Sequence, residues 1–517
     1  MAIFIKRVQT VMSLSQMDKE AGVTSNVDGR HGPLSPVKDC AGRNMPVYGF
    51  ASSTSTPRKY RRICSERNLA IIPIEEEAPR WSPTSLEDDI FYIQDAESDC
   101  IQRTLKVPSD QVVPMSIDSP GSSTGSAPHL SGDGSLLDTV LTAMWDECAA
   151  EGLFRYDLSA CTTKKVPGKY GFVAQLNEGR ATKKRPTEFR VDQVCQPFDE
   201  SKFNFKKAYM QEVLFRFEPL TMFSADEEGA GSPAVVPDSL SRFSNDSEDP
   251  IPASRIIEAV PCMGSPNLVV INVSPIEYGH VLLVPRVLDN LTQLVDAETM
   301  TLALHFAKEA DNPCLRVGYN SLGAYATINH LHFQAYYLRD VLPCERAGTA
   351  PLVLGGKTDG LLCCHKRNRD RTTSLVNISR LVGYPVRGFV LEVISTVSVA
   401  EGIAELARLV GEACVAMQRD NIPHNLIITD MGRRVFIWPQ CFAERQAQGL
   451  LPEQIAATGV NPAVFEIAGH MLLKRQEDYD VLGEDEVAVL EVLRYASLPE
   501  EKFLHVAQMC FRTYCPC

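Results

Sequence analysis

Apolar residues recur every three or four positions in three stretches of the chain, and this period predicts three amphipathic helices. The first helix begins near Leu136, the second follows Asp296, and the third runs from Val399 to Met417. Asp296 stands immediately before its apolar stretch, where a carboxylate can accept hydrogen bonds from the unpaired backbone N–H groups of a first helical turn. We therefore expect Asp296 to cap the second helix.

Short apolar runs between these stretches predict β-strands. Residues 268–273 and 280–284 are two such runs, and the Pro- and Gly-containing segment 274–279 between them predicts a β-hairpin with a wide connection. Further strands are expected at 315–319, 330–338, 387–394, 425–429 and 435–438. The same element types occur twice, so the pattern predicts an α+β fold of two diverged halves, each made of an antiparallel sheet and a helix.

Two segments lack this periodicity. Ser, Pro, Gly, Asp and Thr dominate residues 18–134, and such a composition buries too little apolar surface to offset the entropy of ordering. Residues 224–249 are acidic and rich in Ser, Gly and Pro, so we expect a long flexible loop there. The expected regions are a largely disordered N-terminal region at 1–134, a first half at 135–345 that contains this loop, a second half at 346–505, and a C-terminal tail at 506–517.

Charge and hydropathy exclude some classes of protein. The 517 residues include 51 Lys and Arg against 65 Asp and Glu, which gives a formal net charge of −14. General nucleic-acid binding needs a basic surface, so no nucleic-acid partner is expected, whereas a few local cations suffice for a small phosphorylated ligand. No apolar run approaches the ~20 residues of a membrane-spanning helix, so no membrane partner is expected either.

Cysteine usage bears on location and on metals. The 16 cysteines are scattered and no secretory signal precedes them, which indicates a reducing compartment and a cytoplasmic location. The basic runs at 58–62 and 183–185 are solvated charges or nuclear-import signals, so the nucleus is a second expected location. The segments 363–365 and 515–517 lack a second pair of ligands at zinc-finger spacing, and free thiols are expected there instead of a structural metal.

The segment 330–337 has the most informative chemistry. Side chains of a strand alternate between its faces, so His330, His332, Gln334 and Tyr336 are expected on one face at about 6.5–7 Å intervals, with apolar residues on the other. A neutral imidazole can attack phosphorus and hold a nucleotidyl group, while a neighbouring amide donates to the phosphate oxygens. Spacing alone leaves two alternatives open: a zinc site completed by His280 or a distant carboxylate, and structural histidines.

The residues just before this segment favour a phosphate ligand. Gly318 and Gly323 enclose Asn320 and Ser321, and such a loop can bring backbone N–H groups and small polar donors close to a phosphate.

Taken together, these segments resemble the histidine-triad superfamily. The pattern His-x-His-x-Gln at 330–334, after the hairpin at 274–285, is similar to the galactose-1-phosphate uridylyltransferase branch, in which Gln replaces the third His. Longer stretches resemble the plant GDP-L-galactose phosphorylases, and they are 167–180, 184–190, 270–286, 318–338 and 461–470. The resemblance covers about residues 136–505, implies a histidine-triad-like fold, and makes the first half the catalytic one.

The resemblance also implies a reaction: GDP-L-galactose and phosphate give L-galactose 1-phosphate and GDP, in the biosynthesis of L-ascorbate. By this correspondence His332 is the nucleophile that becomes guanylylated, His330 and Gln334 position the α-phosphate, and Asn320 and Ser321 match a polar pair that precedes the motif. The zinc-binding cysteines of bacterial uridylyltransferases have no counterpart, so no metal or other cofactor is expected. A homodimer is expected by analogy with these relatives.

Other candidates are less specific. Gly323 and His280 are expected near the nucleotide, and Lys169 and Arg180 belong to a basic stretch that either attracts phosphate groups or forms a solvated turn. Glu466 and His470 either support the site from the second half or belong to the core or surface.

Two competing functions remain open at this level. One is a phosphorylase for another GDP-hexose, such as GDP-D-glucose. The other is a nucleotide-binding regulatory protein without turnover.

Overall fold

The computed structural model describes residues 32–38, 44–51, 135–183, 188–219, 254–260, 264–354 and 375–514. The chain divides into two units, residues 56–130 and the remainder, and every described residue belongs to the second of these. The flexible loop expected at 224–249 and the cysteine segments 363–365 and 515–517 lie outside the described residues.

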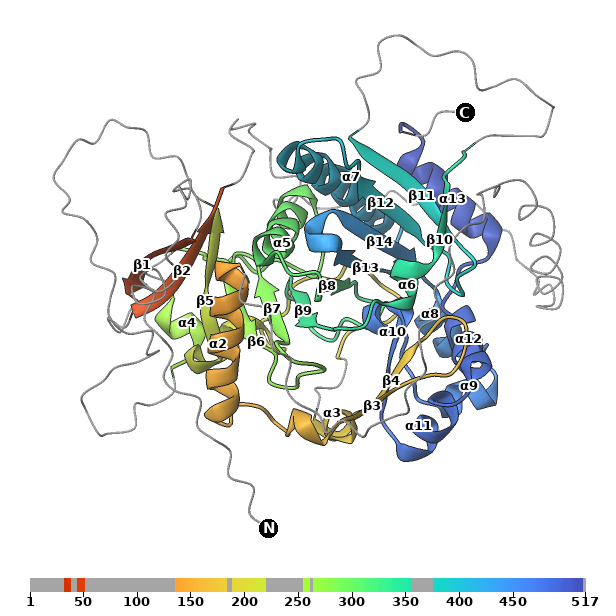
Figure 1. The fold of residues 1–517 in the computed structure, drawn as a ribbon, viewed down its shortest axis with the longest axis horizontal. Coiled ribbons are helices and arrows are strands. Elements are labelled where there is room, and N and C mark those ends of the chain that lie inside the picture. The colour runs from red at the N-terminus through yellow and green to blue at the C-terminus, as the bar shows by residue number, and fades with distance from the viewer. Residues whose placement is uncertain are drawn as a thin grey trace, which may run out of the picture. The chain divides into compact units, whose positions relative to one another are not determined.

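A 12-stranded sheet forms the centre of this unit (Figure 1). Its strands in spatial order are β1 (Gly32–Lys38), β2 (Asn44–Phe50), β5 (Val213–Pro219), β6 (Leu268–Ile271), β7 (Val281–Val284), β9 (Phe333–Tyr337), β8 (Leu315–Asn320), β13 (His424–Thr429), β14 (Arg434–Pro439), β12 (Phe389–Val393), β11 (Val376–Val382) and β10 (Gly348–Pro351). Neighbouring strands pair antiparallel except for β2 and β5.

The sheet contains the expected repeat. Strands β6 and β7, helix α5 (Ala297–Ala310), and strands β8 and β9 make the first half, while β11, β12, α7 (Val399–Arg419), β13 and β14 make the second. The halves join where β8 pairs with β13, so one sheet runs through both. The α+β class with two antiparallel-sheet-plus-helix halves is therefore confirmed, and so is the Asp296 cap, whose side chain accepts a hydrogen bond from Thr299 N.

Helices cover one face of this sheet. Helices α5 and α7 lie side by side (Figure 1), and α2 (Leu136–Ala150) and α13 (Glu500–Phe511) flank them over the largest apolar core. Leu331, Phe333 and Ala335 alternate with the candidate site residues along the segment 330–335, and their side chains are part of this core. Their alternation leaves the other face of β9 for the polar side chains.

Smaller elements cover the other face. A second sheet joins β15 (His470–Leu473), β4 (Val173–Leu176) and β3 (Thr162–Lys165), so that segments from both ends of the unit pair with each other. The remaining helices are α3 (Glu178–Lys183), α4 (Ile256–Ala259), α6 (Pro343–Arg346), α8 (Phe442–Ala447), α9 (Glu453–Ala457), α10 (Val464–Ala468), α11 (Gln476–Leu482) and α12 (Glu486–Arg494).

The structure adds to one expectation from the sequence and corrects another. The N-terminal region that is expected to be largely disordered contains the strands β1 and β2, and the Phe50 ring of β2 stacks on Phe217 in the core. The strand expected from His330 begins only at Phe333, because the backbone of the preceding residues bonds to loop residues instead of a neighbouring strand.

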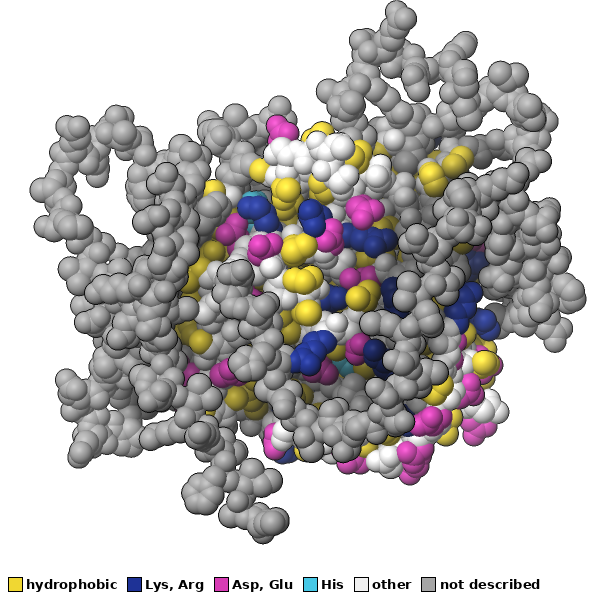
Figure 2. All heavy atoms as spheres, in the orientation of Figure 1, with side chains coloured by type: hydrophobic (Ala, Val, Ile, Leu, Met, Phe, Trp, Pro, Cys, Tyr) yellow, Lys and Arg dark blue, Asp and Glu magenta, His cyan; other side chains and the backbone are white. Residues whose placement is uncertain are grey.

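The surface and helices of the described part are ordinary for a folded domain. On the face shown in Figure 2, the visible Lys and Arg side chains are interspersed with Asp and Glu. None of the helices in the described ranges combines the length and the apolar character that crossing a bilayer would require.

The contact between α5 and α7 depends on Gly411. A Cβ at this position would lie 2.4 Å from the backbone N of Ala297 and 2.5 Å from its Cα. We expect Gly411→Ala to lower the free energy of unfolding by about 1–3 kcal/mol through this overlap, although Ala is the better helix former by about 1 kcal/mol. The matched control is Gly348→Ala, whose Cβ would make an ordinary 3.6 Å contact. Thermal unfolding checks this, and equal midpoints for both variants would contradict it.

Candidate active site

His332 is held in place by a glutamine that precedes helix α5. Gln293 Oε1 accepts a hydrogen bond from His332 N at 3.0 Å, and Gln293 Nε2 donates to the carbonyl oxygens of Asn320 and His332 at 2.9 and 3.2 Å. One amide therefore ties the end of β8 to the segment before β9. The sequence pattern did not predict this role of Gln293, because nothing in the neighbouring residues indicates a contact with residues about 30 to 40 positions away.

The ring of His332 has a defined tautomer. Its Nδ1 lies 2.8 Å from the backbone carbonyl oxygen of His330, which can only accept, so Nδ1 carries the proton. Nε2 is then the basic nitrogen of the neutral ring. The His332 side chain is 6% exposed and lines a pocket, with its ring centroid 5.1 Å from that of Phe205. An imidazole that lines a pocket and carries its lone pair on Nε2 when the ring is neutral is suited to nucleophilic attack.

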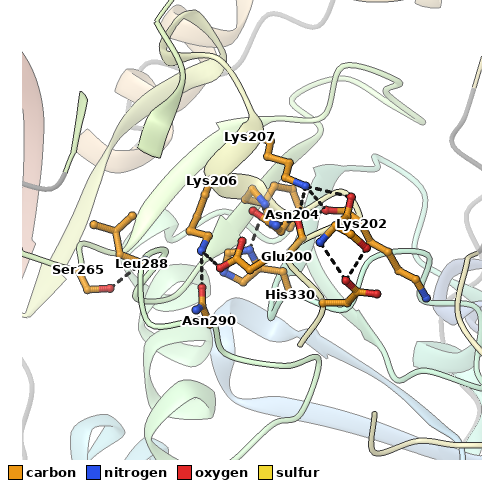
Figure 3. A network of polar contacts seen from close by, with 12 residues as sticks. Glu200, Lys202, Asn204, Lys206, Lys207, Ser265, Leu288, Asn290 and His330 are labelled. Atoms are coloured by element: carbon orange, nitrogen blue, oxygen red, sulfur yellow. Dashed lines mark hydrogen bonds and ion pairs between the residues drawn. The ribbon is translucent and has the colours of Figure 1, made fainter. Parts of the chain in front are cut away.

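The ring of His330 lies behind this wall. Its Nδ1 accepts a hydrogen bond from Phe205 N at 3.0 Å, so the neutral ring carries its proton on Nε2. Burial lowers the pKa of His330 to about 3, and the nearby charges of His332 and Lys206 act in the same direction. Lys206 Nζ donates to Glu200 and Asn290 beside it (Figure 3). The described geometry thus lets His330 act on His332 through its carbonyl group.

The pocket that His332 lines has apolar, neutral polar and charged side chains around it. Gln334, the β9 residue opposite Leu282 and Gly318, shares the wall with His332. The other lining residues are Arg155, Arg180, Phe203, Phe205, Glu212, Val270, Ile271, Asn272, Val273, Ser274, Leu282, Tyr325, Ala326, Thr327 and Ile328. This set offers aromatic and aliphatic contacts for a ring system and two guanidinium groups for phosphates.

The two arginines reach the pocket from the segment between α2 and β5. Arg180 donates from its guanidinium to the carbonyl of Ser274, and its backbone N donates to Asn177 Oδ1 at 2.8 Å. Arg155 Nη1 donates to the Lys183 carbonyl at 2.6 Å. The structure thus brings the predicted Arg180 to the site and adds Arg155, which the sequence pattern did not single out.

Lys169 lies elsewhere. It is exposed in the loop between β3 and β4, where its backbone N donates to Glu486 Oε2 at 2.8 Å. It is not among the residues that line the pocket.

Asn320, Ser321 and Gly323 support the pocket from behind. Asn320 Oδ1 accepts hydrogen bonds from Asn425 Nδ2 at 2.6 Å and from Val464 N at 2.9 Å. Ser321 Oγ accepts a hydrogen bond from His424 N at 2.9 Å. Gly323 has φ +78°, and a Cβ there would lie 2.8 Å from a backbone oxygen. These residues fix the connection 321–332, which supplies residues 325–328 to the pocket.

His280 organises the β6–β7 turn. It is fully buried, its Nδ1 accepts from Ile276 N at 2.8 Å, and its Nε2 lies 3.1 Å from Nδ2 of the pocket residue Asn272. The structure places the His280 ring one layer behind the pocket wall.

A buried polar cluster lies behind β9. Tyr336 Oη is 2.9 Å from His470 Nδ1, and His470 Nε2 is 4.0 Å from Glu277 Oε1. Burial lowers the pKa of His470 to about 4 and raises the pKa of Glu277 to about 7. Glu466 is buried nearby on α10. His470 thus supports β9 from the second half of the chain.

The second half carries no equivalent pocket segment in its described part. Strands β13 and β14 are joined by the tight turn Asp430–Gly432, whereas the corresponding strands of the first half are joined by residues 321–332, which contain both histidines.

Within the described ranges, no group of three or more His, Cys, Asp or Glu side chains is arranged to hold a metal ion. The expected absence of a metal stays a prediction.

The Glu277 carboxyl gives a pH-dependent contribution to stability. The pKa of Glu277 is about 7 in the folded protein, whereas the ordinary pKa of a glutamate is 4.5. The stability that the protonated carboxyl contributes is therefore complete below pH 4.5 and is lost as the pH rises through 7. We expect Glu277→Gln to remove this loss, which is on the order of 2 kcal/mol. Denaturant unfolding of both proteins at pH 5 and pH 8 measures it, and a constant difference between them would contradict it.

Comparison with known proteins places the chain in a family. The family models of the GDPGP1-like N-terminal domain and the GDPGP1-like C-terminal domain match residues 136–235 with 242–336, and residues 365–516. GDP-L-galactose phosphorylase 1 of Arabidopsis thaliana is 47% identical over 380 residues, which are 72% of this chain and 73% of that protein. GDP-D-glucose phosphorylase 1 of Homo sapiens is 30% identical over 376 residues, which are 70% of this chain and 80% of that protein.

A solved structure was also matched. The yeast Ap4A phosphorylase Apa2 in complex with Ap4A is 14% identical, with a TM-score of 0.41, and the match covers 71% of this chain and 98% of that one. The two domain models together match more than half of the 517 residues, and the Arabidopsis relative covers more than two thirds of the chain. The chain therefore belongs to the GDPGP1-like family.

Proposed function

We propose that this protein is a GDP-hexose phosphorylase that converts GDP-L-galactose and phosphate into L-galactose 1-phosphate and GDP. The observation that carries the proposal is the hydrogen bond between His332 Nδ1 and the His330 carbonyl. It leaves Nε2 as the basic nitrogen of a ring that lines a pocket together with Gln334 and two arginines. The relatives named GDP-L-galactose phosphorylase in Arabidopsis thaliana, each 47% identical, support this substrate.

The reaction proceeds in two displacements at the α-phosphorus. In the first, His332 Nε2 forms a bond to phosphorus, and the bond from phosphorus to the oxygen bridging the two phosphates breaks, so that L-galactose 1-phosphate leaves with that oxygen. In the second, an oxygen of inorganic phosphate attacks the guanylyl group, the P–N bond breaks, and GDP leaves. His332 returns to its neutral form.

The surrounding residues stabilise these steps. The His330 carbonyl keeps the Nδ1 proton of His332 in place and favours the positive charge that the ring carries while it holds the guanylyl group. The Gln334 amide donates to the α-phosphate oxygens without needing protonation. Arg155 and Arg180 line the pocket and offset the charge of the leaving and attacking phosphates.

GDP-D-glucose is the second candidate substrate. Relatives from Xenopus laevis and Homo sapiens at 28% and 30% identity are named GDP-D-glucose phosphorylases. Initial rates with both GDP-hexoses distinguish the two candidates. Trapping a labelled GMP adduct on the protein excludes the alternative of a nucleotide-binding regulatory protein without turnover.

The expected cytoplasmic and nuclear location and the expected homodimer stay predictions. Light scattering of the purified chain measures its mass in solution and so tests the homodimer.

His332→Ala is expected to lower phosphate-dependent GDP release by at least about 1,000-fold, because no other group forms the covalent intermediate. The variant should also fail to form an acid-labile GMP adduct. His505→Ala is the matched control, since His505 is exposed on α13. Equal rates for His332→Ala and the wild type would contradict the assignment of His332 as the nucleophile.

Gln334→Ala is expected to lower kcat by about 100-fold, because the lost amide acts on charge that develops at the α-phosphate. The KM for the GDP-hexose should change much less. Steady-state kinetics beside Gln508→Ala, an exposed glutamine on α13, measure this. An effect confined to KM would show that Gln334 only binds substrate.

A further inference from the structure

A second pocket has a volume of about 630 Å³ and is lined by residues that the proposed reaction does not use. The described residues that line it are Trp145, Asp146, Ala149, Gly152, Phe154, Tyr156, Asp157, Leu158, Ser159 and Tyr278. None of them lines the pocket of His332. Arg155, which lies between two of them in the sequence, lines the His332 pocket instead, so the two pockets are neighbours with separate linings.

Four aromatic side chains line this second pocket. The Trp145 ring is buried, and the ring centroids of Phe154 and Tyr278 lie 4.7 and 5.0 Å from it. Its indole Nε1 donates to the His280 carbonyl at 3.3 Å, which fixes the orientation of the ring. Tyr156 is the fourth aromatic residue. The faces of aromatic rings carry partial negative charge and attract cations, so these walls favour a ligand with a positive charge.

Two carboxylates line the same pocket, and both are hydrogen-bonded to neutral groups. Asp146 Oδ2 accepts from Tyr278 Oη at 3.1 Å, and Asp157 Oδ1 accepts from Ser159 Oγ at 2.7 Å. Among the described residues that line the pocket there is no Lys, Arg or His. Two negative charges that no neighbouring cation offsets repel phosphate groups, so this pocket does not suit a second nucleotide.

The C-terminal end of α2 adds to this negative charge. Asp146 and Ala149 lie in the last two turns of α2, Gly152 follows the helix, and all three line the pocket. The last turn of α2 contains no basic residue. The carbonyl end of a helix carries a partial negative charge that favours cations. Aromatic rings, carboxylates and helix end therefore all favour the same ligand charge.

We propose that this second pocket is a binding site for a small organic cation of the alkylammonium class. The aromatic rings contact the apolar groups around the nitrogen, while Asp146 and Asp157 offset its charge. A neutral sugar offers hydroxyl donors to the carboxylates and leaves their charge in place, so it suits the pocket less well. The proposal does not depend on the proposed function, because the described linings of the two pockets have no residue in common.

Choline and its neutral isostere 3,3-dimethyl-1-butanol test the proposal, because they share a shape and differ in charge. In ligand-observed NMR titrations of the full chain, we expect choline to bind at least about tenfold more tightly than the isostere. Asp146→Asn removes one charge at constant size and should weaken choline binding by about fivefold. Tyr278→Leu removes one ring and should weaken it by a similar factor of about five. Asp311→Asn, at an exposed aspartate after α5, is the matched control and should keep the wild-type affinity.

Competition with GDP locates the bound cation. Saturating GDP should leave the affinity for choline unchanged, whereas displacement of choline by GDP would place the cation in the His332 pocket and overturn the proposal. Asp146 is exposed on α2, so thermal midpoints of Asp146→Asn and the wild type should agree and show that the variant is folded.

Three further results would overturn the proposal. They are the lack of saturable choline binding, equal affinities of the wild type for choline and for the isostere, and equal affinities of the wild type and Asp146→Asn for choline. Tighter binding of methyl β-D-galactoside than of choline would identify a site for a neutral sugar and would contradict the proposal as well. Each of these results leaves the proposed function unaffected, because that function is measured by phosphate-dependent GDP release.

Discussion

The hydrogen bond from His332 Nδ1 to the His330 carbonyl is the interaction on which the chemistry of this site depends. An imidazole has two nitrogens of similar basicity, and only a fixed acceptor at one of them decides that the other holds the lone pair. Here the acceptor is a backbone oxygen two residues earlier, at 2.8 Å. Because a backbone carbonyl does not titrate, the tautomer does not depend on the protonation of a neighbouring side chain.

That geometry is stabilised by contacts from several parts of the chain. Gln293 holds the backbone of His332, Phe205 N holds the ring of His330, and Asn425 holds Asn320 across the junction of the two halves. Each contact satisfies a buried polar group that would otherwise cost stability, so the same bonds that stabilise the fold also orient the nucleophile. We therefore expect loss of any one of these bonds to disturb the position of His332.

The two halves share their element order and differ in one connection. In the first half the segment between the last two strands is long enough to carry two histidines and four pocket residues, whereas in the second half a three-residue 3₁₀ turn replaces it. The second half contributes contacts from Asn425, Val464 and His470 that support the proposed site in the first half. Duplication of the fold is therefore not duplication of the site.

The sequence alone determined the element types and singled out the segment that we propose to be reactive. Period-2 and period-3.6 patterns are local properties, so the hairpin at β6 and β7, the helices α5 and α7, and the His-x-His-x-Gln segment could be recognised from neighbouring residues. Strand β2 was missed because its pairing with β5 is a contact between distant segments that composition does not reveal.

Only the tertiary structure decided which candidates meet. Arg155 and Glu212 reach the pocket from two separate segments, and Gln293 holds the His332 backbone from a third, while Lys169 and the ring of His280 lie outside the pocket. No local pattern distinguishes these cases. The physical reason is that a pocket is formed by side chains brought together through long-range strand pairing and core packing. Such neighbours follow from the complete topology, which a short window of sequence does not contain.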